Sequence, residues 1–492
     1  MDNTAFENRY TNKVEPLYGE PRNEETDQLL IENNNVAKSI NTTSPRTYSI
    51  PSDQRIDFST KPTYSIDPPG CEDADDAFSI YTSNTSSEGE TLWLAIHIAD
   101  PTELIHLESS LWNDIVERTV TRYPSNRKPI HMMPKSIVDE ASLMVNSFGD
   151  RKNAITILTQ IDSETFAPQG RIKLLFTTIK VETDRALTYH DACRTVDTNF
   201  VLSMGLKISN ALKEQRSKKT IGTCLSDVST STVHYTDTHG AQLVASNNQE
   251  IEMKQMIAEF AIFANSFVGE YLKIRMGGMG IFRTCDAAEW LGTVFDGITG
   301  DNLLNKIITN GIQADYLSSN AAHDLVGAPE YCHFTSPIRR LADCVCHYLI
   351  KYLFLTDLGE NHVVPFTSEQ LDDIANRCLT MTKKMKTIQY RDTKFRLIQT
   401  MNNTLCHNRL SLHITFFITS YTGVFLNVIV CNIGEHKVHM SYSIIVDGIE
   451  PDNIDFNEKK SINITHVKCP GKYDGGSIPQ LDTFLRGYIM MT

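Results

Sequence analysis

The sequence lacks the features of a secreted, zinc-binding or membrane-spanning chain. Its eleven cysteines are scattered over 492 residues, only Cys344 and Cys346 lie close together, and no CxxC-type zinc spacing occurs. The N-terminal residues contain no apolar signal segment, and polar residues and glycine interrupt the most apolar stretch, Leu412 to Cys431. We therefore expect free thiols, no membrane partner, and a cytoplasmic or other reducing intracellular location.

An excess of basic residues is also lacking. The net charge is −14 and the pI is about 5.5, which excludes a surface coated with Lys and Arg for nonspecific binding of polyanions. Any polyanion must then be held by local basic patches and metal. Hydrophobic content of 41% is ordinary for a globular chain of this length, and we expect two to four domains.

The most distinctive feature present is an acidic stretch from Tyr64 to Phe78, YSIDPPGCEDADDAF. It contains four aspartates beside Glu72: Asp67, Asp73, Asp75 and Asp76. Strand-like residues flank it, and Pro68-Pro69-Gly70 predicts a turn. Carboxylates this dense repel one another, and hard oxygen ligands select hard cations, so the stretch predicts a site for Mg²⁺, with Mn²⁺ as an alternative.

Two other interpretations of the acidic stretch were considered. An exposed acidic loop without a ligand is the general alternative, and the stretch by itself leaves it open. A calcium loop of the EF-hand kind is excluded, because counting from Asp73 puts Phe78 where that loop requires glycine and Ala77 at a ligand position.

A second distinctive stretch runs from His333 to His347, HFTSPIRRLADCVCH. Ser336 suits a helix N-cap and Pro337 the first helical position, so we expect a helix that starts here. Arg339 and Arg340 would then lie in the first turn, where cations oppose the helix dipole and an anion such as phosphate would offset them. A salt bridge between Arg339 and Asp343 is the structural alternative.

Weaker candidates lie along the rest of the chain. The segment from Arg118 to Met133 interleaves basic residues with Tyr123, which suits either a strand-binding rim or a solvated loop. A helix predicted over Glu250 to Arg275 carries Glu259 and Asn265 among apolar residues, where polar groups usually bond something.

The later half of a helix predicted over Leu371 to Met401 is basic except for Asp392, and it is either a phosphate-contacting wall or a solvated face. His97 and Asp100 are also site candidates, although a lone strand histidine is more often part of a core.

The pattern of elements predicts an α+β chain in three parts. Residues 1–50 are polar and are predicted to form an irregular arm. Residues 51–402 alternate strand and helix patterns and are predicted to form one mixed α/β domain. Residues 403–492 carry short alternating runs with glycines at the breaks, which predicts a small OB-like β-barrel.

Together, the two distinctive stretches resemble the ribonuclease II (RNB) family of exoribonucleases. The acidic signature of that family, I-D-P-x-x-x-x-D-x-D-D-A, is present from Ile66 to Ala77, and its H-F-T-S-P-I-R-R is present unchanged from His333 to Arg340. Leu341 and Tyr348 depart from the family's usual residues. The resemblance covers about residues 55 to 400.

The resemblance implies Mg²⁺-dependent 3′→5′ hydrolysis of single-stranded RNA to nucleoside 5′-monophosphates. The four aspartates would hold the metal and, with Arg339, form the catalytic group, in which Arg339 stabilises charge on the phosphate. Tyr123, Tyr189 and Glu259 match positions that contact the 3′-terminal nucleotides, and Ser336 and Arg340 of the second motif would also contact RNA.

The ends of the chain depart from the family pattern. Family members carry two cold-shock domains before the catalytic domain, and about fifty polar residues are too few to encode them. We therefore expect a weaker grip on RNA, or a protein partner that supplies it. The alternative function is an RNA-binding or scaffold protein with this fold and weak or no catalysis.

Overall fold

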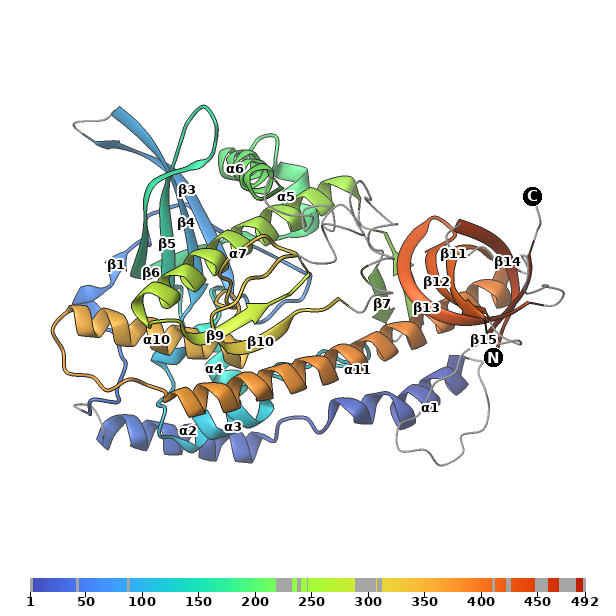
Figure 1. The fold of residues 1–492 in the computed structure, drawn as a ribbon, viewed down its shortest axis with the longest axis horizontal. Coiled ribbons are helices and arrows are strands. Elements are labelled where there is room, and N and C mark those ends of the chain that lie inside the picture. The colour runs from blue at the N-terminus through green and yellow to red at the C-terminus, as the bar shows by residue number, and fades with distance from the viewer. Residues whose placement is uncertain are drawn as a thin grey trace.

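The computed structural model describes residues 3–40, 44–85, 89–217, 232–236, 240–245, 247–287, 307, 312–408, 412–421, 426–446, 459–468 and 484–489. A mixed α/β region and a closed β-barrel lie at opposite ends of the long helix α11, Ser368–Asn408 (Figure 1). The predicted mixed α/β class is confirmed. Within the described residues, no helix is both long and apolar enough to cross a membrane.

The α/β region is built on a six-stranded sheet with the order β1-β6-β2-β3-β4-β5. β2 pairs in parallel with β6, and β3, β4 and β5 continue as antiparallel neighbours. β4 is buried along most of its length, as its apolar sequence predicts. The strands are β1 Ile56–Asp57, β2 Thr63–Asp67, β3 Asp76–Thr85, β4 Gly89–Ala99, β5 Arg151–Ile161 and β6 Pro168–Thr188.

The sheet places the acidic stretch at one edge. β2 ends at Asp67 and β3 begins at Asp76, so the loop between these two paired strands carries the other two aspartates. Asp67 lies opposite Thr188 at the end of β6, and Tyr189 begins the next helix. Two segments far apart in sequence therefore meet beside the carboxylates.

Helices pack around the sheet and supply the rest of its core (Figure 1). α6 and α7 pack against each other, while α10 and α11 both contact β9. The helices are α3 Ser110–Arg118, α4 Lys135–Ala141, α5 Tyr189–Thr195, α6 Phe200–Ser217, α7 Asn248–Arg275 and α10 Leu341–Asp357, with short 3₁₀ turns η1 Glu15–Tyr18, η2 Ser52–Gln54 and η3 Pro101–Glu103. Two antiparallel pairs complete the region, β7 Thr232–Thr236 with β8 Gly240–Val244 and β9 Met279–Thr284 with β10 Asp315–Ser319.

The barrel closes in the order β11-β12-β13-β15-β14, with β14 pairing back to β11. Alternate apolar residues such as Ile414, Phe416, Val428 and Val430 fill it, and the same cluster includes Ile398 of α11. The strands are β11 Leu412–Tyr421, β12 Leu426–Ile433, β13 His436–Val446, β14 Lys459–Lys468 and β15 Phe484–Ile489.

The prediction of an irregular N-terminal arm is wrong. Residues Asn3–Lys13 form helix α1 and Glu24–Ile40 form helix α2. α1 runs alongside α11, and α2 packs against α3 (Figure 1). Phe6, Tyr10 and Val14 are at most 1% exposed and pack with Phe395 of α11. These residues recur every fourth position, so a polar segment with one sparse apolar face becomes helical by docking rather than by its own propensity.

His97 and Asp100 belong to the core rather than to a site. His97 is fully buried between the hydroxyls of Ser79 and Thr156, at 3.0 and 2.8 Å. Asp100 is paired with Lys351 and Arg55, both at 2.9 Å, and neither Asp100 nor Lys351 is exposed. Burial alone would raise the pKa of Asp100, but the two cations hold it below its usual value.

Replacing Lys351 with Met is expected to lower the free energy of unfolding by about 3 kcal/mol, because Asp100 would stay buried with one cation instead of two. Urea denaturation followed by circular dichroism measures the change. Arg151→Met is the control, since Arg151 pairs with Asp57 at an exposed site where ion pairs contribute little. Equal midpoints for the two variants would contradict the prediction.

Candidate active site

All four aspartates line one open cavity of about 510 Å³ at the edge of the sheet. The second motif forms the opposite wall, and one face of α7 forms a third side. The predicted site residues found here are Asp67, Asp73, Asp75, Asp76, Tyr123, Tyr189, Ser336, Arg339 and Arg340. The structure therefore brings together nine of the ten residues to which the family resemblance gives a role in catalysis, metal binding or RNA binding.

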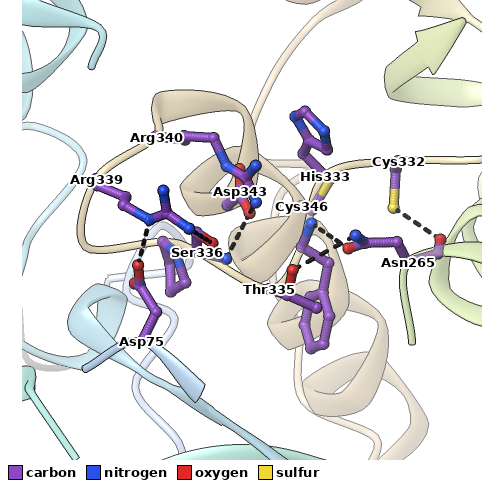
Figure 2. A network of polar contacts seen from close by, with 12 residues as sticks. Asp75, Asn265, Cys332, His333, Thr335, Ser336, Arg339, Arg340, Asp343 and Cys346 are labelled. Atoms are coloured by element: carbon purple, nitrogen blue, oxygen red, sulfur yellow. Dashed lines mark hydrogen bonds and ion pairs between the residues drawn. The ribbon is translucent and has the colours of Figure 1, made fainter. Parts of the chain in front are cut away.

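Asp75 joins the two motifs. Its Oδ1 accepts a hydrogen bond from the backbone N–H of Ile338 at 2.8 Å. Its Oδ2 accepts one from Nε of Arg339 at 2.9 Å (Figure 2). The Arg339 side chain remains 44% exposed, whereas that of Asp75 is 3% exposed. The carboxylate thus anchors the arginine from beneath and leaves part of the guanidinium accessible from the cavity.

A second carboxylate, Asp343, fixes the turn before α10. Its Oδ1 accepts hydrogen bonds from the backbone N–H of Ser336 at 2.7 Å and from Nη2 of Arg340 at 2.9 Å (Figure 2). The structural alternative, a salt bridge between Arg339 and Asp343, is therefore excluded, because Arg340 pairs with Asp343. The hydroxyl of Ser336 accepts from Nη2 of Arg339 instead, at 2.9 Å.

The helix also starts later than predicted. α10 begins at Leu341, and residues 336–340 form a single turn closed by a hydrogen bond from Arg340 N to Ser336 O. Arg340 has extended backbone angles because it forms a β-bridge with Val120, so the helix cannot include it. The second motif therefore presents its arginines from a turn rather than from the first turn of a helix.

The remaining carboxylates are crowded and poorly compensated. Burial and the neighbouring Asp76 raise the pKa of Asp67 to about 7, and burial raises that of Asp76 to about 6 although Arg339 and Arg340 oppose it. Oδ2 of Asp67 is buried without a hydrogen-bond partner. A carboxylate oxygen in this state is stabilised by a cation more than by any neutral ligand.

The donor set therefore suits a hard divalent cation. All four candidate ligands are carboxylates, and Asp67, which has an unpartnered oxygen, lines the same cavity as Asp76 and Asp73. In the part of the chain that the structure describes, however, no three His, Cys, Asp or Glu side chains lie close enough to coordinate one ion. The ligand types therefore suit a hard cation, and the carboxylates would have to move closer together to coordinate it.

Two tyrosines flank the carboxylates. The hydroxyl of Tyr123 donates to Oδ2 of Asp73 at 3.1 Å, and Tyr123 is 37% exposed. Tyr189 begins α5, and the ammonium of Lys254 lies 5.6 Å from the centre of its ring. Both rings line the cavity, as flat apolar surfaces on which a base could stack.

Glu259 is not part of this cavity, contrary to the sequence-based prediction. The residues of α7 that line it are Lys254, Ile257, Ala258, Ala261, Ile262 and Asn265, which share one helical face. Glu259 lies on another face, is 2% exposed, and forms an ion pair with Arg216 beside a second cavity. A one-residue step along a helix turns a side chain by about 100°, which explains the difference.

Asn265 is a site residue whose role the sequence did not define. Its side chain accepts from the backbone N–H of Phe334 at 2.9 Å and donates to Tyr331 and Thr335 at 3.1 and 3.4 Å (Figure 2). It therefore fixes the start of the second motif from α7. A polar residue among apolar neighbours indicated that Asn265 bonds to something. The sequence could not identify its partners, because they lie about seventy residues away.

Most basic residues of the segment from Arg118 to Met133 do not face the cavity. Arg122 donates to the backbone carbonyl of Tyr18 at 2.8 Å, and Arg118 pairs with Asp114. On α11, Arg396 is fully buried, while Lys383 pairs with Asp315. The interpretation of these segments as continuous phosphate-binding surfaces is therefore wrong for Arg118, Arg122 and Arg396.

The chain belongs to the RNB family, since the RNB domain matches residues 55–356. Its relatives include the exosome complex exonuclease RRP44 homolog A of Arabidopsis thaliana, which is 26% identical over 329 residues, 58% of this chain and 34% of that protein. The chain thus spans about a third of the length of the curated relatives at this level of similarity.

Solved structures share the fold. RNase R of Mycoplasma genitalium with ribose-methylated single-stranded RNA aligns with a TM-score of 0.66 and 15% identity, over 93% of this chain and 75% of that one. Yeast Ssd1, described as a pseudonuclease, aligns with a TM-score of 0.58 and 16% identity, over 90% and 56% of the two chains. The same fold therefore occurs in proteins with and without nuclease activity.

The raised pKa values predict how the metal-free protein responds to pH. Asp67 and Asp76 bind protons more tightly in the folded than in the unfolded state, so their contribution makes stability fall as pH rises from about 4 to about 7. The loss is on the order of 1.4 kcal/mol for each unit by which a pKa is raised. Mg²⁺ should therefore raise the melting temperature more at pH 8 than at pH 5.

Thermal unfolding with and without Mg²⁺ at both pH values measures this difference. Asp67→Asn should reduce both the pH slope and the response to Mg²⁺, whereas Asp184→Asn, at an exposed position on β6, should leave both as in the parent chain. A Mg²⁺ response of equal size in all three proteins would contradict a cation site at Asp67.

Proposed function

We propose that the protein is a hydrolytic 3′→5′ exoribonuclease that depends on Mg²⁺, or on Mn²⁺ in its place, and releases nucleoside 5′-monophosphates from single-stranded RNA. The observation that carries the proposal is the pair of Asp75 and Arg339, which joins two motifs 264 residues apart at the wall of an acidic cavity. An arginine held next to four carboxylates matches a substrate that bears negative charge and a reaction that requires a cation.

Asp67, Asp73, Asp75 and Asp76 are the proposed metal ligands. When bound, the metal would neutralise charge on the phosphate and lower the pKa of water. Arg339 is held by Asp75 and Ser336, so its exposed edge is oriented before substrate arrives. Such a fixed donor stabilises the charge that develops on a phosphate oxygen without the cost of reorganisation.

Tyr123 and Tyr189 are proposed to stack on the 3′-terminal bases, and Ser336 and Arg340 to contact the RNA backbone. All four line the cavity. Stacking accepts any base, which suits an exonuclease that removes nucleotides irrespective of sequence. Preference for RNA over DNA would come from contacts to the 2′-hydroxyl group. Glu259 is left out of this set because of its position beside the second cavity.

The barrel is proposed to be of the OB type and to form, with the end of α11, a domain over residues 403–492 that follows a catalytic domain over 51–402. The strand order supports this, because a fifth strand lies between the third and the fourth in a closed five-stranded barrel. We further propose that a partner protein assists RNA binding.

A scaffold protein that binds RNA without cleaving it is the second candidate. Two observations favour it: each oxygen of Asp75 already accepts a hydrogen bond, from Ile338 or from Arg339, and in the described chain no three candidate ligands are close enough to hold an ion. The presence of all four aspartates supports the enzyme instead.

Asp75→Asn is expected to reduce hydrolysis about 1000-fold while RNA affinity changes little, because the substitution removes a negative charge from the proposed metal ligands and leaves the two stacking tyrosines and Arg340 in the chain. A time course on 5′-labelled single-stranded RNA with Mg²⁺ measures hydrolysis, and fluorescence anisotropy measures binding. Asp184→Asn is the control and should match the parent chain.

The labelled products separate the candidate functions. A ladder that shortens from the 3′ end and disappears with EDTA supports the exoribonuclease. Intact RNA that is nevertheless bound by the parent chain supports the scaffold, and equal losses of binding and hydrolysis in Asp75→Asn would contradict the role given to Asp75.

A further inference from the structure

The first helix and the turn after it run beside the loop that carries Tyr123. We call residues 3–19 the N-terminal strap and residues 119–128 the Tyr123 loop. Asn126 donates to the carboxylate of Glu15 at 2.9 Å, and Arg127 pairs with the same carboxylate at 3.2 Å and donates to the carbonyl of Gly19 at 3.2 Å. Most of one side of the loop is therefore held by the strap.

Gly19 shows how closely the two segments approach. Its φ of +80° is one that residues with a side chain rarely adopt, and an added Cβ would lie 2.8 Å from Nη1 of Arg122. That same nitrogen donates to the carbonyl of Tyr18 at 2.8 Å. The end of the strap is thus shaped to receive the arginine that directly precedes Tyr123.

Asp392 of α11 connects the strap and the loop in one network. Its Oδ2 accepts from the hydroxyls of Tyr10 and Tyr18, both at 2.8 Å, and from the backbone N–H of Ser125 at 3.1 Å. Its Oδ1 accepts from the hydroxyl of Ser125 at 2.7 Å. Asp392 is 3% exposed, so a buried carboxylate has four donors from two other segments.

Arg396 lies one turn further along α11 and belongs to the same network through Ser125. It is fully buried, pairs with Glu7 of the strap at 2.8 Å, and donates to the hydroxyl of Ser125 at 2.9 Å. Its guanidinium carbon lies 3.8 Å from the centre of the Tyr10 ring. A buried network in which each member has several partners is rigid, and it fixes the positions of the groups that it joins.

The other side of the loop reaches the reactive groups. Tyr123 donates to Asp73, and the loop backbone bonds directly to the second motif, since Thr121 N donates to Arg339 O at 3.0 Å and Leu341 N to Thr119 O at 2.9 Å. The loop is thus held between the strap on one side and the Asp73 and Arg339 segments on the other.

We propose that the N-terminal strap positions Tyr123 at the aspartate cavity through Tyr10, Tyr18 and Asp392, and so sets how the 3′ end of the RNA is seated. The proposal rests on the exoribonuclease function. The proposal makes positioning residues of Tyr10, Tyr18 and Asp392. They line no part of the cavity, and they act on Tyr123 through Ser125, which lies two residues further along the chain.

The double variant Tyr10→Phe/Tyr18→Phe tests this role, since it keeps both rings and removes both hydroxyls. We expect kcat to fall about tenfold while KM stays within about twofold, because seating of the last nucleotide affects the chemical step whereas the rest of the strand supplies most of the affinity. The shortest RNA left at the end of the reaction should become longer.

Tyr48→Phe is the matched control. Tyr48 is also a buried tyrosine, and its hydroxyl donates to the carbonyl of Val363, away from the Tyr123 loop. It should match the parent chain in kcat, KM and final RNA length. Asp392→Asn is a second test variant and should resemble the double variant.

A measurement without substrate keeps this inference separate from the proposed function. The backbone N–H of Ser125 should exchange its hydrogen at least about tenfold faster in the double variant than in the parent chain or Tyr48→Phe, as mass spectrometry of the peptide around residues 123–128 would show. Unchanged exchange would overturn the positioning role even if the parent chain degrades RNA. Faster exchange in the double variant, together with a parent chain that never cleaves RNA, would overturn the function and leave the anchoring intact.

A double-mutant comparison completes the test. If the strap acts through Tyr123, then adding the two Tyr→Phe changes to Tyr123→Ala should alter final RNA length no further. Additive effects on final RNA length would show that the strap acts independently of Tyr123 and would overturn the proposal.

Discussion

The contact on which the site depends is the one between a buried carboxylate and a half-exposed guanidinium. Asp75 lies at the end of the loop between β2 and β3, where the sheet fixes its backbone, and it holds both Arg339 and the N–H of Ile338. Because Asp75 is nearly inaccessible, the pair is weakly screened by solvent. The second motif consequently has one position relative to the acidic stretch, and the cavity between them has one shape.

A second network, around Asp392, holds the loop from which Tyr123 reaches the same cavity. It joins the N-terminal strap, the Tyr123 loop and α11, as the site joins the sheet, α7 and the second motif. The two networks meet at Tyr123 and Arg339 through backbone bonds between residues 119–121 and 339–341. Segments that carry no part of the chemistry thus contribute to the geometry of those that do.

The sequence predicted the features that depend on residue type. It did not predict those that depend on the direction in which a side chain points. The crowding of Asp67 and its neighbours, and the arginine pair of the second motif, were recognised because their charges need compensation wherever they lie. The sequence could not show that Arg339 pairs with Asp75, because its near neighbour Asp343 was also available and only the fold gives that carboxylate to Arg340. Glu259 was expected at the RNA site, but it lies one step around α7 from the face that lines the cavity. The docked strap could not be predicted, because its sparse apolar face is buried only by packing against α11, almost 400 residues later in the chain.

The separation of bonded partners along the chain has a consequence for folding. Tyr10 and Asp392 are 382 positions apart, and Asp75 and Arg339 are 264 apart, so neither network can form until most of the chain has been synthesised. During translation the first helix would leave the ribosome long before its docking surface exists. Such high contact order slows folding and prolongs the exposure of apolar faces, and the strap residues Phe6 and Tyr10 would be a natural binding site for chaperones in that interval.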